Sequence, residues 1–377
     1  MNRRLWWVMA VLCALVVLAP RAMAQQPPET HPTSEHRDIV MSWDRSAIPG
    51  DIELWAPRTV FGYEQQGTLE YGRMFMTCSS NSSSRRGKCP TSDTLENGVG
   101  SNSSIPLRFT ESRSGMEVDI EVTAAIRRID ATGACSFDYW SGPFRPIWSS
   151  VTGSCGGVDR VGTAVEMKLS SGQLEQLVAG HWSAKLDLAL RKPPHQHLAD
   201  YSFTFAFTIT DHNAVSIYFP LFDQVTPHVG LNLQYDPIAQ TVGGRAQLDM
   251  CLYDGLGSQS QYLGVTVRDS GPRPPGPSGY SVWHTDGGSD ATQRVDYNVT
   301  LDHNGSALPM RNGVEQLLHG IDTAKLRLVL LPGMTQPVFC VPTPLALDTP
   351  RVPVSSKRPG YYDGDLKVEL RVPTVTP

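Results

Sequence analysis

The segment YSFTFAFTIT, Tyr201 to Thr210, decides the fold class. Every second residue in it is aromatic or aliphatic, and small or hydroxylated residues stand between them. A period of two places the apolar side chains on one face of an extended chain and the polar ones on the other. The segment is therefore predicted to be a β-strand with one face in a core.

The same alternation recurs throughout the chain, and no long helical pattern accompanies it. It is found at 116–122, 182–190, 229–233, 263–267, 295–301 and 366–372. Residues 170–179 and 313–320 are expected to form only helical connections of one or two turns. Since 33 glycines and 29 prolines divide the chain into short strands, we expect β-sandwiches.

The chain begins with the features of a secretory signal peptide, followed by room for two domains. Arg3 and Arg4 precede the apolar run Leu5 to Ala19, and Ala22-Met23-Ala24 fits a cleavage site, so residues 1–24 are predicted to be removed. The rest of the chain is long enough for two cores. Polar turn formers at Asp211-His212-Asn213 place the boundary between domains 25–211 and 214–377.

The cysteines agree with export to an oxidising compartment. Beyond the signal, six remain: Cys78, Cys89, Cys135, Cys155, Cys251 and Cys340. An even number in an exported chain indicates disulfides, and six cysteines allow about 15 pairings. Their layout favours bonds within each domain, which we expect to be 78–89, 135–155 and 251–340. The absence of a C-x-x-C spacing argues against a metal centre.

The net charge of −5 makes nucleic acid an unsuitable partner, because phosphates require a basic face. An anionic ligand would need a local basic cluster. The candidates in the first domain are Arg73, Arg127, Arg128, Arg191 and Lys192, each expected at the solvated surface.

Catalytic and metal-binding interpretations have little support, and we expect no enzyme, cofactor or metal. Gly153 to Gly157 (GSCGG) resembles the nucleophile loop of chymotrypsin-like cysteine proteases, but the upstream His31 and His36 lie in a segment where nothing could hold a base. His195 and His197, with His181, are too few to predict a zinc site. The proline-rich start, residues 25–37 (QQPPETHPTSEHR), is expected to be poorly ordered.

Several motifs in a common order resemble the CfaE/CblD family, the tip adhesins and pilus-initiating subunits of bacterial class-five and cable-type fimbriae. They are YGRMFMTCSS with GKCPTSD (71–93), IPLRFTESRS (105–114), HWSAKLDLALRK (181–192), LDMCLYDG (248–255) and PVFCVPTPLALD (337–348). The resemblance covers most of the chain after residue 24, and the shared order with its cysteines is more specific than any single motif.

The resemblance implies two tandem immunoglobulin-like β-sandwiches, an adhesin domain followed by a pilin domain. It implies that the pilin domain lacks one strand, which a major pilin subunit supplies, and that a periplasmic chaperone and an outer-membrane usher take part in assembly. The expected location is the tip of a fimbrium, reached by secretion through the periplasm. Because residues 25–37 contain no alternating apolar strand, the chain is expected to accept a strand and not to donate one.

The resemblance also implies that arginines of the first domain bind a host-cell glycoconjugate. Arg73 occupies one such position, and Arg191 or Lys192 occupies a second, where the basic run of the family is shortened. The alternative is a purely structural subunit that initiates the pilus and has little affinity for a receptor.

Overall fold

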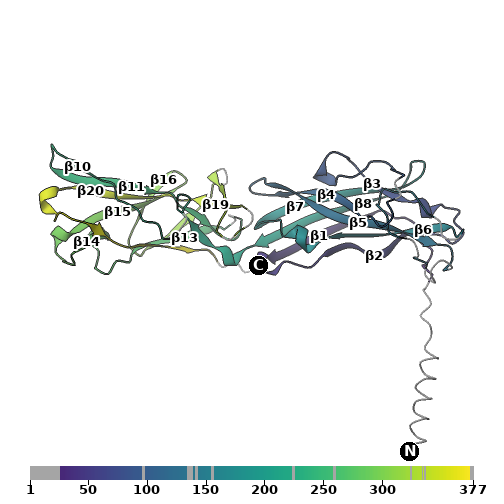
Figure 1. The fold of residues 1–377 in the computed structure, drawn as a ribbon, viewed down its shortest axis with the longest axis horizontal. Helices are drawn as coiled ribbons and strands as arrows, with labels where there is room; N and C mark the ends of the chain where they lie inside the picture. The colour runs from purple at the N-terminus through teal and green to yellow at the C-terminus, as the bar shows by residue number, and fades with distance from the viewer. Residues whose placement is uncertain are drawn as a thin grey trace, which may run out of the picture.

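The computed structural model describes residues 26–95, 98–133, 139–140, 143–153, 157–222, 226–257, 260–322, 325–332, 334 and 337–373. They form two β-rich bodies arranged end to end (Figure 1). The one α-helix among them is the single turn α2 (Ser171–Leu174), where the sequence predicted a short connection. No helix in the described ranges has the length and apolarity to cross a membrane.

The first body contains eight strands in one sheet, in the order β1-β8-β7-β4-β5-β6-β2, with β3 paired to β7. Their bounds are β1 Glu35–Asp44, β2 Ile52–Tyr63, β3 Phe75–Cys78, β4 Ser103–Glu111, β5 Glu117–Asp130, β6 Arg160–Leu169, β7 Gly180–Lys192 and β8 Gln196–Thr210. The β1–β8 pair is parallel, and the other pairs are antiparallel.

The segment 201–210, in β8, supplies one wall of the first core. Tyr201, Phe203, Phe205, Phe207 and Ile209 are all buried, as their alternation predicted. Trp55 of β2 packs edge-on against three aromatic rings of this core at centroid distances of 4.7 to 5.3 Å. Such contacts add stabilisation beyond the burial of apolar area.

The prediction of a poorly ordered start is wrong for residues 26–37. Thr30 exchanges two backbone hydrogen bonds of 2.9 Å with Tyr63 at the end of β2, and the Gln26 side-chain amide donates to the Tyr63 hydroxyl at 2.9 Å. Strand β1 begins at Glu35 and pairs with β8 from Tyr201 onward. A polar, proline-rich composition predicts disorder only when no partner is available, and here the free edges of β2 and β8 provide partners.

The second body is built from shorter strands in three sheets: β10-β11-β20-β15-β14-β21 with β16 on β15, then β18-β19-β12-β9, and β17-β13-β22. The bounds are β9 Ser216–Tyr218, β10 Leu233–Asp236, β11 Thr241–Leu248, β12 Cys251–Tyr253, β13 Tyr262–Asp269, β14 Tyr280–His284, β15 Arg294–His303, β16 Ser306–Met310, β17 Glu315–His319, β18 Arg327–Val329, β19 Val338–Pro342, β20 Leu345–Pro353, β21 Tyr362–Asp363 and β22 Leu366–Arg371.

Two sequence predictions for the second body need correction. Residues 313–320 are not a helical turn, because Glu315–His319 form β17 and pair with β13. The alternation at 229–233 forms a strand only from Leu233, whose side chain is exposed. In both places a neighbouring strand edge decided which residues form a strand. The local sequence pattern carries no information about such an edge.

Two of the expected disulfides are present, Cys78–Cys89 and Cys251–Cys340. The third expected pair, Cys135 and Cys155, lies outside the described residues.

The two bodies share a packed joint. Cys251, Tyr253 and Cys340 belong to the same apolar cluster as the core of the first body. The backbone N–H of Asp211 donates to the Gly255 carbonyl at 2.6 Å, and the Asp211 carboxylate lies 3.4 Å from Arg45. Burial raises the pKa of Asp211, against the opposing effect of Arg45. The joint therefore combines apolar packing with a buried polar contact.

Candidate functional site

Three predicted basic residues, Arg73, Arg191 and Lys192, come together at one end of the first body. Arg73 closes the 3-10 turn η2 (Tyr71–Arg73), and the other two end β7. Strand β3 pairs with β7 so that Phe75 lies opposite Arg191, only two residues after Arg73. The Lys192 ammonium donates to the carbonyl of Leu69 at 2.9 Å, which brings it beside the same turn. Residues separated by about a third of the chain thus form one basic surface.

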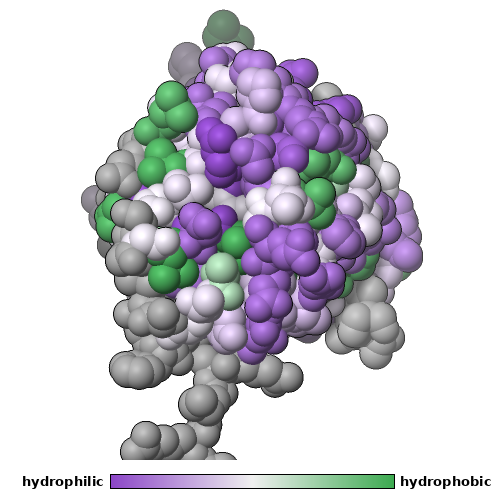
Figure 2. Space-filling view, turned by 90° about the vertical axis from the view of Figure 1, so that its right-hand side faces the viewer, coloured by the Kyte–Doolittle hydropathy of each residue, from purple (hydrophilic) through white to green (hydrophobic). Residues whose placement is uncertain are grey.

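This basic surface lies far from the joint between the bodies. Strand β7 begins at Gly180, against which Gly257 of the second body packs, and it ends at Lys192. Twelve steps of about 3.3 Å separate the two ends by about 40 Å. Figure 2 views the molecule from the free end of the first body, and most of its coloured face is hydrophilic, with separate apolar patches. The basic surface is therefore directed away from the second body.

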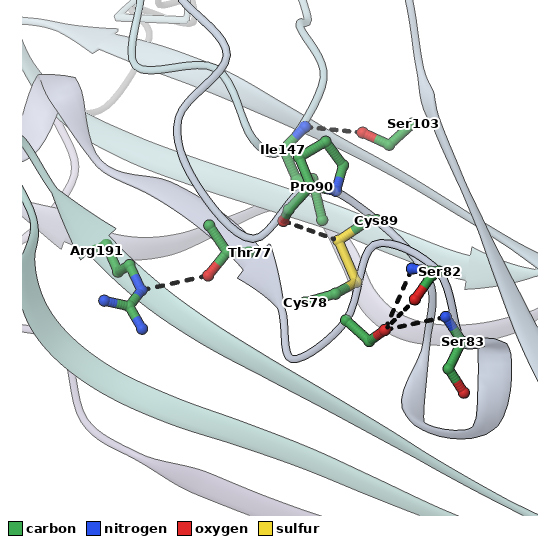
Figure 3. Close-up of a disulfide and its surroundings, with 10 residues drawn as sticks. Thr77, Cys78, Ser82, Ser83, Cys89, Pro90, Ser103, Ile147 and Arg191 are labelled. Carbon is green, nitrogen blue, oxygen red and sulfur yellow. Dashed lines mark hydrogen bonds between the residues drawn. A yellow bond between two sulfur atoms is a disulfide. The ribbon is translucent and has the colours of Figure 1, made fainter.

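Two of the three basic side chains are only loosely held. The Arg73 guanidinium lies 3.5 Å from the Glu70 carboxylate, and both side chains are about half exposed, at 46% and 50%. The Arg191 Nε donates to the Thr77 hydroxyl at 3.3 Å, as Figure 3 shows. An exposed ion pair such as Arg73–Glu70 contributes about 0–1 kcal/mol to stability. Arg73 can therefore exchange Glu70 for an anionic ligand at little cost to the fold.

Arg128, predicted at the surface, is instead fully buried beneath the turn that carries Arg73. Its guanidinium donates to the carbonyls of Met74 at 2.7 Å, Ser149 at 2.6 Å and Val151 at 3.2 Å, and to the Thr163 hydroxyl at 2.6 Å. Burial, and to a smaller extent repulsion from neighbouring arginines, lowers the pKa of Arg128 to about 9. Arg128 can be buried because these three carbonyls and one hydroxyl accept the hydrogen bonds that a buried guanidinium must donate.

The turn η2, which carries Arg73, is held in place by residues that pack beneath it. The Thr163 hydroxyl that accepts from Arg128 donates to the Tyr71 carbonyl at 2.7 Å. A Cβ at Gly72 would lie 1.9 Å from the Arg160 carbonyl, so only glycine fits there. His31 Nδ1 lies 2.9 Å from the Tyr71 hydroxyl. In the sequence, Gly72 was the one sign that the turn packs closely against Arg160. Nothing in the sequence around Arg128 indicated its burial.

Arg127, the remaining basic candidate, faces the other side of β5 from Arg128, as strand alternation requires. Its guanidinium carbon lies 5.4 Å from the centre of the Phe144 ring, and its Nε lies 3.9 Å from Glu166. Neither Arg127 nor Arg128 adds to the basic surface, which rests on Arg73, Arg191 and Lys192.

The histidines considered as metal ligands are held apart at opposite ends of the β7–β8 pair. His181 Nδ1 lies 3.0 Å from the Thr208 hydroxyl, and His197 Nε2 lies 2.8 Å from Asp200. Within the described ranges, no three His, Cys, Asp or Glu side chains gather as a metal site. Ser154, Cys155 and Gly156 of the protease-like loop lie outside the described residues.

A second feature of functional interest is an open strand edge in the second body. Strand β22 pairs with β13 on one side and ends its sheet, with no further strand among the described residues. Its inward side chains, Leu366, Val368 and Leu370, are only partly buried although they pack on the core. A free backbone edge above incompletely covered apolar residues is a site where another extended chain can pair.

Comparison with known proteins gives matches over both bodies. Residues 20–212 match the family model for the first domain of the CFA/I fimbrial subunit CfaE, and residues 215–374 match the model for its second domain. The corresponding CFA/I fimbrial subunit of Escherichia coli is 26% identical over 307 residues, which cover 79% of this chain and 80% of that protein.

Solved structures show the same fold at lower sequence identity. The crystal structure of CfaE, the adhesive subunit of the CFA/I fimbria of enterotoxigenic Escherichia coli, has a TM-score of 0.65 at 23% identity, covering 93% of this chain and 95% of that one. A chain from a chaperone–tip adhesin complex of CFA/I fimbriae biogenesis has a TM-score of 0.65 at 22% identity, covering 93% and 99%.

Proposed function

The chain belongs to the CfaE family of fimbrial subunits, and we propose that within it the chain is the subunit at the pilus tip that binds a host-cell glycan. It is a fimbrial adhesin subunit with two tandem β domains. The proposed domains are 25–211, which binds the receptor, and 214–377, the pilin domain. The observation that carries the proposal is the convergence of Arg73, Arg191 and Lys192 at the free end of the first domain.

The chemistry of this basic surface suits an acidic or polar glycan. Arginine donates two parallel hydrogen bonds to a carboxylate or sulfate, and lysine adds a flexible charge. Arg73 is exposed and weakly paired with Glu70, so it is available to a ligand. Lys192 donates to the Leu69 carbonyl and Arg191 to the Thr77 hydroxyl. We therefore assign Arg73 the main role, with Arg191 or Lys192 as the second contact.

We further propose that the second domain accepts a donated strand along β22. A strand there would form a ladder of hydrogen bonds with the free edge and cover Leu366, Val368 and Leu370. The proposed partners are a periplasmic chaperone, which covers this edge first, an outer-membrane usher, and a major pilin subunit whose N-terminal strand replaces the chaperone. A chaperone–tip adhesin complex is known for a relative.

Placement at the tip is supported by the use of the N-terminal segment. Residues 30–44 are engaged within the first domain, through the Thr30–Tyr63 pair and through β1. A segment held in this way cannot be passed to a neighbouring subunit. The chain would therefore end a row of subunits, at the surface that meets the host cell.

The test is Arg73→Ala in an assembled pilus, with Arg86→Ala as a matched control. Arg86 is a more exposed arginine of the same domain, with its guanidinium 3.1 Å from Asp187. Loss of a charge-assisted hydrogen bond costs about 1.5–3 kcal/mol, so Arg73→Ala should weaken glycan binding roughly 10- to 100-fold at unchanged piliation. Normal host-cell adhesion by the Arg73→Ala pilus would refute the assignment.

A structural initiator is the second candidate function, favoured by the open β22 edge. In that case the subunit serves chiefly to start polymerisation. Deleting the gene separates the two: complete loss of pili favours initiation, whereas intact pili that do not adhere favour the adhesin alone.

A further inference from the structure

We propose that a depression beside the Cys78–Cys89 disulfide binds a neutral sugar ring, as a second carbohydrate site independent of the basic surface. The depression has a volume of ≈ 470 Å³ and is lined by residues that include Asn81, Lys88, Thr91, Pro106 and Trp148. Ligand sites commonly occupy about 300–1,000 Å³. Its volume lies within this range.

The lining combines the two surfaces that a pyranose ring requires. The partly buried Trp148 and Pro106 both line the depression and contribute apolar area, on which the C–H face of a sugar can pack. Asn81 and Thr91 are exposed at the rim, where an amide and a hydroxyl can each both donate and accept hydrogen bonds. Small-ligand sites typically combine an apolar floor with a few polar groups placed to form hydrogen bonds, as this lining does.

The depression carries less positive charge than the basic surface, which suits a sugar without a charged group. Among the described residues of its lining, Lys88 is the single charged one, and an exposed ammonium donates hydrogen bonds to hydroxyls as well as to anions. The basic surface, by contrast, presents two arginines and a lysine. The two sites therefore suit different residues of a glycan, or different glycans.

The walls of the depression are held rigidly before any ligand arrives. The disulfide joins Cys78 to Cys89. Next to it, the Lys88 N–H donates to the Pro106 carbonyl at 2.9 Å, and the Cys78 N–H to the Pro90 carbonyl at 3.1 Å. The Trp148 carbonyl accepts from the Thr94 N–H at 3.4 Å. Because the site is preformed, little conformational entropy is lost when it binds a ligand.

The depression and the basic surface lie on different sides of β3. Thr77, which accepts from Arg191, and Cys78, which forms the disulfide, are consecutive residues and point to opposite faces of the strand. Figure 3 shows Arg191 and the disulfide on either side of Thr77. A substitution at one site should therefore leave the other unchanged.

The experiment uses saturation-transfer NMR to detect magnetisation that passes from the full chain, within its pilus, to a bound probe. The two probes are methyl β-D-galactoside and methyl N-acetyl-β-D-glucosaminide. We expect magnetisation transfer to the ring protons of at least one glycoside. Trp148→Ala should weaken that binding about tenfold or more, and Asn81→Ala, an exposed substitution that does not threaten folding, should also weaken it. Arg85→Ala, an exposed cation outside the depression, is the matched control and should bind normally.

Two results would overturn the proposal: no transfer to either glycoside, or transfer that both Trp148→Ala and Asn81→Ala leave unchanged. If Trp148→Ala fails to fold, Asn81→Ala decides. Arg73→Ala separates this site from the proposed receptor surface, since it should weaken host-cell adhesion without altering glycoside binding. Loss of glycoside binding in Arg73→Ala would show that the two sites are one.

Discussion

Replacing Arg128 by methionine should loosen the turn that presents Arg73, although Arg128 itself never reaches the surface. The buried guanidinium donates to four acceptors, one of which is the carbonyl of Met74, next to Arg73. Methionine is a shorter, unbranched apolar side chain and has no donors. The variant therefore removes the support of the turn and leaves Arg73 in place.

The expected magnitude follows from two opposing contributions. Four hydrogen bonds from a charged donor are worth about 1.5–3 kcal/mol each, or roughly 6–12 kcal/mol together. Against this stands the relief of no longer burying a charge, since burial lowers the pKa of Arg128 well below its usual range. We expect a net loss of about 4 kcal/mol, because the four acceptors stay buried without their donor.

The assay is urea denaturation of the full chain, together with hydrogen exchange of the segment 74–78. Met76 is a local reporter, because its N–H donates to the Ile147 carbonyl at 2.6 Å, and its exchange should accelerate when the turn loosens. Glycan binding should fall about as far as in Arg73→Ala. Arg127→Met is the control: the neighbouring arginine is part-exposed, with its nearest carboxylate 3.9 Å away, and its loss should cost under about 1 kcal/mol.

Equal stability of Arg128→Met and Arg127→Met, or unchanged hydrogen exchange at 74–78, would refute the role assigned to Arg128. A stable Arg128→Met protein with normal exchange but lost binding would also contradict it, because the role assigned to Arg128 acts only through the turn.

Three further predictions concern other parts of the chain. Replacing Cys251 and Cys340 together by alanine should cost about 4.6 kcal/mol in thermal unfolding, because the disulfide closes a loop with a sequence separation of 89; a loss under about 1 kcal/mol would contradict this. Val368→Asp, on the inward face of β22, should prevent strand acceptance and reduce piliation seen by electron microscopy, whereas Lys367→Asp on the outward face should assemble normally. Asp44→Asn should be less stable than the wild-type chain at pH 7. Burial alone would raise the pKa of Asp44, but hydrogen bonds from Ser46, His212 and Thr210 outweigh it and lower the pKa, so this stability is present above about pH 3.9 and is lost as the pH falls through the folded-state value. A difference in melting temperature that stays constant down to pH 2 would argue against that assignment.

The sequence by itself determined the strand-rich architecture, two disulfides and the family. Alternation is a local property, since side chains two residues apart share a face whatever the rest of the chain does. For this reason the strands around Trp182, Phe205, Val265 and Val299 were predicted, and all of these residues are buried. The motif order pointed to the family that the comparisons with known proteins then showed.

Only the tertiary structure decided where polar groups lie and which distant residues meet. Thr30 forms a bridge, and residues 35–37 and 315–319 lie in strands, because neighbouring edges had unpaired backbone groups. Arg127 and Arg128 are adjacent in sequence, yet one is part-exposed and the other fully buried. Burial of a charge depends on acceptors brought from remote segments, here Met74, Ser149 and Thr163. The same long-range pairing, β3 on β7, places Arg73 beside Arg191, and no local pattern contains that information.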